Sequence, residues 1–251
     1  MEAFVRTEVD DRGVGTITFC HPASNSLPGA ILRQLAEHIS EAGERDDIRV
    51  IVMRSGGDRA FCAGASFDEL VAISNEDDGL AFFSGFALVI NAIRTCPKFV
   101  IGRVQGKTVG GGVGLAAAVD HCFATKFAAV KLSELAVGIG PFVVGPAVER
   151  KLGVSGMGTL AVDARTFKSA QWAADHGLYA EVFDTAEELD EAVSRLAGEL
   201  ASSNPEAMTH LKRVLWEGTE HWDELLTERA AISGKLVLSE FTRNAIAAFK
   251  T

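Results

Sequence analysis

The sequence has few cysteines, and their spacing does not suit a fold held together by disulfides or zinc. Cys20, Cys62, Cys96 and Cys122 form no CxxC pair and have no histidine cluster beside them. A disulfide framework needs paired cysteines in a short chain, and a structural zinc site needs closely spaced Cys or His ligands. The sequence therefore predicts a fold stabilised by its hydrophobic core, with no metal site.

Long apolar runs and an excess of basic residues are also absent. No run reaches the roughly 18 uncharged residues of a membrane-spanning helix. The acidic N-terminus MEAFVRTEVDD lacks the apolar core of a signal peptide. Lys and Arg total 24 against 34 Asp and Glu, and the resulting net charge of −10 opposes binding to nucleic acid. We therefore expect a cytoplasmic protein with no membrane or nucleic-acid partner.

The composition is that of an ordinary globular protein. Apolar residues make up 47% of the chain and charged residues 23%, and 251 residues are enough for one large domain with a buried core. Predicted strands and helices follow each other along the first two thirds of the chain, and no internal repeat is visible. In the last third, apolar residues recur at the spacing of a helix. Predicted strands cover residues 5–9, 14–19, 48–53, 98–104 and 178–183, and predicted helices cover 31–39, 79–93, 115–123, 144–152, 166–177 and the chain from 186 onward.

The main chemical signal lies in residues 96–141. A mostly apolar run at 98–104 predicts a buried strand, a glycine cluster follows, and an alanine-rich segment then predicts a helix that includes His121 as a packed or capping residue. Glycine lets a ligand approach the main chain, and the first N–H groups of a helix suit negative charge. This pattern is typical of half an oxyanion hole. The cluster consists of Gly110, Gly111, Gly112 and Gly114.

Two other interpretations of the glycine cluster stay open at this point. Gly112-x-Gly114-x-x-Ala117 fits a dinucleotide-binding turn, and Glu134 lies at about the separation at which that motif places an acid for a ribose. The glycines could also serve a purely structural turn. A single motif of this kind is weak, and this one does not lie in the first βα unit of the chain. The anion-stabilising site is therefore the favoured interpretation.

A second turn of small residues, at Ala63, Gly64 and Ala65, comes after the predicted strand at 48–53. Two such turns at the same end of neighbouring parallel strands could each direct one N–H group at the same oxygen atom. Glu134 comes after the glycine cluster and has apolar neighbours, which favour a partly buried carboxylate with a raised pKa. We therefore consider Glu134 a candidate base, with a solvated loop acid as the alternative.

Four segments, in order along the chain, resemble the motifs of one family. They are FCAGA at 61–65, GGG at 110–112, SELAVGIGP at 133–141 and ADHGL at 174–178. Together they resemble the enoyl-CoA hydratase/isomerase (crotonase) superfamily, and the resemblance runs through nearly the whole chain.

The resemblance implies an α/β fold, a substrate class and an assembly. The crotonase-like core, a spiral of ββα units with an acyl-CoA site, corresponds to residues 1–185, and residues 186–251 correspond to a helical oligomerisation region. The implied partner is an acyl-CoA thioester, with no separate cofactor because coenzyme A is part of the substrate. The implied assembly is a homotrimer or a homohexamer.

The same resemblance assigns roles to individual residues. The N–H groups of Ala65 and Gly111 correspond to the pair that binds the thioester oxygen and stabilises an enolate. Glu134 corresponds to a catalytic glutamate. The other residues of the two turns are then expected to contact the substrate, namely Ala63, Gly64, Gly110, Gly112 and Gly114.

The sequence departs from the family pattern at three places. The family's hydratases carry a second glutamate, and its position is Gly114 here, so only Glu134 remains. Adding water is well served by paired carboxylates, whereas one carboxylate can move a proton between two carbons, which favours double-bond isomerisation. Ser66 stands where many relatives have aspartate, which affects the expected loop geometry. The C-terminal segment resembles the family's final helix but lacks its basic tail, which leaves Lys250 as a candidate contact for the CoA phosphates.

Two alternatives to an isomerase follow from the same residues. Glu134 could hydrate an enoyl-CoA, including a branched or methylglutaconyl-type substrate, with a water molecule held in a different way. The chain could also keep the fold and bind acyl-CoA without turnover, and Gly114 is the best argument for that alternative.

Overall fold

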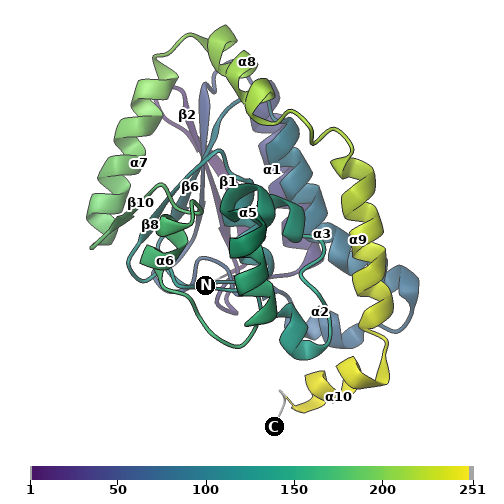
Figure 1. The fold of residues 1–251 in the computed structure, drawn as a ribbon. Coiled ribbons are helices and arrows are strands. Elements are labelled where there is room, and N and C mark those ends of the chain that lie inside the picture. The colour runs from purple at the N-terminus through teal and green to yellow at the C-terminus, as the bar shows by residue number, and fades with distance from the viewer. Residues whose placement is uncertain (1, 249–251) are drawn as a thin grey trace.

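Six strands form a central sheet whose spatial order follows the order of the chain (Figure 1). The computed structural model describes residues 2–248. The first two strands pair antiparallel and all later neighbours pair parallel. Five strands predicted from the sequence are confirmed, with shifted ends: β1 (Phe4–Val9), β2 (Val14–Cys20), β4 (Val50–Ser55), β6 (Val100–Val104) and β10 (Glu181–Phe183). The sixth strand, β8 (His121–Thr125), begins within the segment predicted as a helix.

The sheet is buried on both faces, which explains its apolar strands. In β4, Ile51 and Met53 belong to the core cluster shared with α1 (Gly29–Glu44) and α3 (Glu76–Thr95). Val50 and Val52 point the other way, into the cluster with α7 (Ala186–Ala201). Side chains of a strand alternate between faces, so one apolar run supplies both clusters. Figure 1 shows α7 on one side of the sheet and the pair α1 and α3 on the other.

A strand–strand–helix unit recurs four times and confirms the predicted ββα architecture. In each unit a long strand of the sheet is followed by a two-residue strand and then by helix: β2–β3–α1, β4–β5–α2–α3, β6–β7–α4, and β8–β9–η1–α5. The four units share the order of their strands and helices but not their amino acids, so no repeat is visible in the sequence. The added elements are β3 (Ser26–Leu27), β5 (Gly64–Ala65), α2 (Phe67–Ala72), β7 (Thr108–Val109), α4 (Gly111–Ala118), β9 (Val130–Lys131), η1 (Glu134–Val137) and α5 (Gly145–Val162).

The helix predicted after the glycine cluster is shorter than expected, and His121 is not on it. Helix α4 ends at Ala118, and His121 is the first residue of β8. The prediction at this position was wrong because helix propensity is weak against strand pairing. Here β8 pairs with both β6 and β10, so its backbone N–H and C=O groups find hydrogen-bond partners on both sides.

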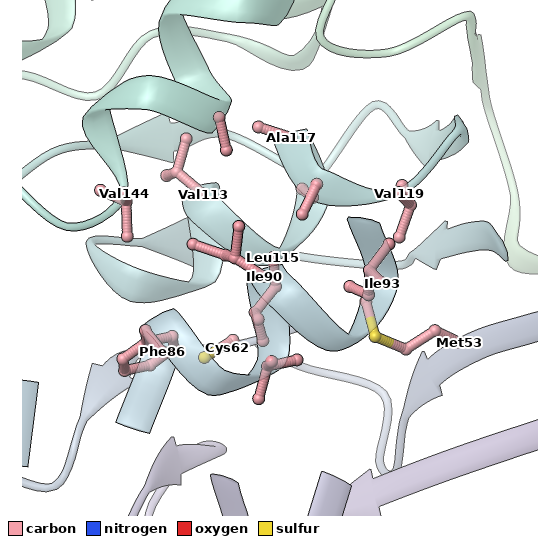
Figure 2. Packing of buried hydrophobic residues seen from close by; sticks show 14 of the residues in the cluster. Met53, Cys62, Phe86, Ile90, Ile93, Val113, Leu115, Ala117, Val119 and Val144 are labelled. Atoms are coloured by element: carbon pink, nitrogen blue, oxygen red, sulfur yellow. The ribbon is translucent and has the colours of Figure 1, made fainter. Parts of the chain in front are cut away.

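Helix α4 is buried all round, as a helix with no polar face must be. Its side chains pack against α3 and against the start of α5, as Figure 2 shows for Val113, Leu115, Ile90 and Val144. Tight packing on every side leaves little freedom for the glycines at its first turn.

Helices α7, α8 (Pro205–Leu215) and α9 (Trp222–Leu236) belong to the same cores as the sheet, whereas Ile246 of α10 (Glu240–Ala248) packs in a separate cluster. Helix α9 packs along α3, where Gly79 and Gly234 approach so closely that a Cβ added at Gly79 would lie 2.6 Å from the Gly234 Cα. The division at residue 185 and the oligomerisation role of the helices remain predictions. Lys250 lies outside the described residues. The remaining helix is α6 (Ala170–Asp175).

Within residues 2–248, no helix is both long and apolar enough to cross a membrane. In the same part of the chain, no group of three or more His, Cys, Asp or Glu side chains is arranged to hold a metal ion.

Candidate active site

A cavity of about 450 Å³ lies where the short turns of the second and third ββα units meet η1. The residues Ala63, Gly64 and Ala65 form one part of its wall, and Gly110, Gly111 and Glu134 form another. The structure therefore brings six of the eight predicted site residues to one cavity. Much of the remaining wall is apolar and includes Phe67, Leu70, Phe82, Phe83, Phe86 and Phe142.

Backbone contacts between neighbouring units position the first turn. Val109 N donates to Cys62 O at 2.9 Å, which ties the chain before Gly64 to β7. Gly64 has φ +95°, a conformation that glycine adopts without strain. A Cβ at Gly64 would lie 3.3 Å from Val109 O and 4.0 Å from Gly111 N. The two turns therefore lie against each other, and glycine makes that approach possible.

The glycine cluster opens α4 at the cavity. Gly110 has φ +54°, and its N–H donates to Lys131 O at 2.8 Å, which joins the turn to the strand that precedes Glu134. Gly111 is the first residue of α4, so its N–H has no acceptor within the helix and lies at the positive end of the helix dipole. A Cβ at Gly111 would lie 2.3 Å from Phe86 Cζ, so the ring of Phe86 requires glycine there.

Gly112 and Gly114 lie behind the cavity wall and are not among its lining residues. A Cβ at Gly112 would lie 2.7 Å from Cys62 Cβ and from Cys62 O. A Cβ at Gly114 would lie 2.4 Å from Val144 Cγ1. Both glycines serve close packing of α4, which departs from the expectation that they contact substrate. This packing also leaves no room for a pyrophosphate at Gly112 and Gly114, so the dinucleotide interpretation has no structural support.

Glu134 begins η1 and directs its carboxylate at the glycine turn. A Cβ on Gly110 would lie 3.1 Å from Glu134 Oε1, so the absence of a side chain there lets the carboxylate approach. The turn of η1 is closed by Gly138, which has φ +84° and donates its N–H back to Glu134 O and Leu135 O. The backbone on both sides of Glu134 is thereby held, by the Gly110–Lys131 bond before it and the Gly138 cap after it.

Burial sets the protonation behaviour of this carboxylate. The Oε2 atom of Glu134 is buried and has no hydrogen-bond partner among the described residues. Burial raises the pKa of Glu134 from 4.5 to about 7, although backbone N–H groups of Glu134 and Ser133 act in the opposite direction. A carboxylate with this pKa can both accept and return a proton near neutral pH. Beside it, the helix end can stabilise negative charge that develops on a bound oxygen.

The raised pKa predicts how the rate of a proton transfer by Glu134 depends on pH. If Glu134 removes the proton, only its ionised form is active, so kcat/KM should rise through a pH of about 7 and level off above it. Below that value the rate should fall about tenfold per pH unit. A pH profile of kcat/KM measures this, and a midpoint near the ordinary value of 4.5 would contradict it.

Some site residues were not singled out from the sequence. The predicted helix at 79–93 left core and pocket lining as alternatives, and both occur: Phe82, Phe83 and Phe86 line the cavity, whereas Ile90 and Ile93 are in the core. Lys131 and Arg165 also line the cavity. Nothing in the sequence near Arg165 marks it, because its place depends on where the loop after α5 folds back. That Ala65 and Gly111 direct their N–H groups at one oxygen atom remains a prediction.

Comparisons with known proteins point to one family. A family model described as Enoyl-CoA hydratase/isomerase matches residues 10–246. The chain is 29% identical over 211 residues to the peroxisomal Delta(3,5)-Delta(2,4)-dienoyl-CoA isomerase of Arabidopsis thaliana, covering 78% of this chain and 74% of the relative. It is 29% identical over 218 residues to the mitochondrial methylglutaconyl-CoA hydratase of Homo sapiens, covering 85% and 64%. The fold matches the crystal structure of enoyl-CoA hydratase from Bacillus halodurans with a TM-score of 0.89, at 21% identity and 98% and 100% coverage.

Proposed function

The chain belongs to the enoyl-CoA hydratase/isomerase family, and on that premise we propose that it moves the carbon–carbon double bond of an enoyl-CoA thioester. The observation that carries this proposal is that Glu134 is the one carboxylate among the described residues that line the cavity. A single carboxylate can take a proton from one carbon and return it to another, whereas the addition of water is better served by a pair.

The proposed reaction begins with the thioester oxygen held by the N–H groups of Ala65 and Gly111. Glu134 removes a proton from the carbon next to the thioester of a 3-enoyl group. The electrons move onto the thioester oxygen, so the intermediate is a dienolate whose charge is stabilised by the two N–H groups and the end of α4. Protonated Glu134 then delivers a proton to the far carbon, and the product is a 2-enoyl thioester whose mass is unchanged apart from exchanged hydrogens.

The space near Gly114 supports this choice between reactions. Val144 lines the cavity and also packs directly on Gly114. An apolar side chain therefore fills the place from which a second carboxylate could reach the substrate. A water molecule there would have a valine as its neighbour, and valine offers it no hydrogen bond.

Solvent deuterium tests the proposal. A 3-enoyl-CoA incubated in deuterated solvent should give a 2-enoyl-CoA that carries deuterium at an acyl carbon, because the proton on Glu134 can exchange with solvent while the dienolate is bound, before it is returned to carbon. Mass spectrometry and NMR identify the product and the labelled carbon. A product that gains water would favour the hydratase. Tight binding of both 2-enoyl-CoA and 3-enoyl-CoA without turnover of either would favour the non-catalytic alternative.

A further inference from the structure

Two cations line the active-site cavity without a counter-ion. Within residues 2–248, the side chains of Lys131 and Arg165 have neither an ion pair nor a hydrogen bond, and both belong to the cavity wall. The chain as a whole carries a net charge of −10, so a local excess of positive charge is a departure from its average surface. Neither cation has a role in the proposed proton transfer.

Backbone pairing holds these two residues at the same wall. Val130 and Lys168 exchange two backbone hydrogen bonds of 2.9 Å, which fasten the loop after α5 to β9. Lys131 follows directly in β9, and Arg165 lies in the fastened loop. The loop is closed upon itself by an ion pair of 2.8 Å between Lys168 Nζ and Asp163 Oδ2. Arg165 is therefore presented by a loop that is tied at both ends.

An aromatic ring orients the ammonium group of Lys131. Lys131 Nζ lies 4.5 Å from the centre of the Phe167 ring, and Lys107 Nζ lies 5.2 Å from the same centre. A ring face attracts a cation but supplies no charge to neutralise it. Lys131 is thus held at the wall with its charge still available to a ligand. Lys107 shares the ring but is not among the cavity-lining residues.

The nearby carboxylates cannot serve as partners. Asp163 is the acid of the same loop, and its pairing with Lys168 lowers its pKa and keeps it engaged there. Asp163 does not line the cavity, and Glu134, which does, must exchange a proton with the substrate in the proposed reaction. Lys131 is half-buried and Arg165 is exposed, so both are accessible, and a bound molecule can supply the complementary negative charge.

We propose that the acyl group of the substrate carries a carboxylate and that Lys131 and Arg165 bind it; this inference rests on the proposed function. Lys131 is three residues from Glu134, a separation of at most about 10 Å along the chain, and Ser133 between them also lines the cavity. An acyl chain whose carbons face Glu134 can place a terminal carboxylate at this wall. The phosphates of CoA are farther from the thioester, beyond the long pantetheine arm.

The rest of the cavity suits the apolar part of such an acyl group. Phe82, Phe83 and Phe86 line it from α3, and they have no polar atoms in their side chains. The substrate class is therefore an enoyl-CoA with an apolar body and an acidic end, a dicarboxylic acid bound as its mono-thioester.

The test compares ligands that differ only at the far end of the acyl chain. Adipoyl-CoA and hexanoyl-CoA have the same chain length and end in a carboxylate and a methyl group. Isothermal titration calorimetry should show adipoyl-CoA binding about tenfold or more tightly to the wild-type protein. Lys131→Gln and Arg165→Gln should each weaken adipoyl-CoA binding about tenfold and change hexanoyl-CoA binding less than about threefold. Lys107→Gln is the matched control and should change neither.

Equal weakening of both ligands would overturn the proposal, because it would assign the two cations to the phosphates of CoA. Equal affinity of the wild-type protein for both ligands would overturn it as well. Both ligands are saturated, so the binding result does not depend on whether the enzyme isomerises a double bond. Turnover of 3-hexenedioyl-CoA and 3-hexenoyl-CoA then tests the reaction separately, since a failure of isomerisation with intact discrimination in binding affects only the proposed function.

Discussion

Glu134→Gln is expected to lower kcat for isomerisation by about two to four decades. Glutamine keeps the size of the side chain and its ability to hydrogen-bond, but it cannot remove a proton from carbon. The cavity wall has no other carboxylate among the described residues to take over the proton transfer. Steady-state kinetics with a 3-enoyl-CoA measure the loss, and incorporation of solvent deuterium into the acyl chain should disappear with it.

The same variant should be more stable than the wild-type protein above neutral pH. The pKa of Glu134 is about 7 in the folded state against 4.5 for the free side chain, so the folded protein binds the proton more tightly. Folding stability therefore falls as the pH rises from 4.5 to about 7 and stays lower above that. Removing this group should recover up to about 3 kcal/mol at alkaline pH. Thermal unfolding at two pH values measures the gain.

A matched control separates the role of Glu134 from a general effect of losing a charge. Glu149 is exposed on α5, and Glu149→Gln removes the same charge from the surface. It should change kcat less than about twofold and leave stability within about 0.5 kcal/mol. Wild-type turnover by Glu134→Gln would remove Glu134 from the mechanism.

A second carboxylate at position 114 is expected to convert part of the activity from isomerisation to hydration, provided that Val144 is removed as well. Gly114→Glu alone forces a Cβ to within 2.4 Å of Val144 Cγ1, so overpacking should destabilise the protein by about 1 to 3 kcal/mol. With Val144→Gly, the nearest remaining atom is the Cα of residue 144, at 3.5 Å. The new carboxylate can then enter the cavity through the space that the valine filled.

The double variant Gly114→Glu/Val144→Gly should raise the ratio of hydration to isomerisation about tenfold or more, because two carboxylates can activate a water and deliver a proton. Products from a 2-enoyl-CoA and a 3-enoyl-CoA, measured by mass, give this ratio. Gly114→Gln/Val144→Gly has the same shape without the charge and is the control. If both double variants have the same ratio, the missing carboxylate does not decide between the two reactions.

The positions of the two turns could be predicted from the sequence because glycine acts locally. Gly64 and Gly110 have positive φ, and each lets a neighbouring group come close, which a larger residue would prevent. The strand before each turn is recognisable from its apolar run. Local chemistry was therefore enough to place the two turns, and the resemblance to the family added Ala65, Gly111 and Glu134 as their functional residues.

The roles of Gly112 and Gly114 could not be predicted in this way. They belong to the same cluster as Gly110 and Gly111, but their Cα atoms face Cys62 and Val144. Which glycine faces a ligand and which faces a side chain depends on how α4 is rotated against its neighbours. His121 illustrates the same limit, because its strand forms by pairing with β6 and β10 against a local helix preference.

The sequence by itself determined the family, the order of strands and helices, and the identity of the residues that can stabilise an anion or carry a proton. The family is recognised from four motifs in order along the chain, and the elements and candidate residues depend on apolar periodicity and on the short-range freedom of glycine. Only the tertiary structure decided that Glu134 Oε2 is buried without a hydrogen-bond partner among the described residues, that Val144 fills the space beside Gly114, and that Lys131 and Arg165 share a wall. Burial and charge pairing depend on atoms contributed from distant parts of the chain. The raised pKa of Glu134 and the positive charge at its cavity wall therefore arise only once the chain has folded.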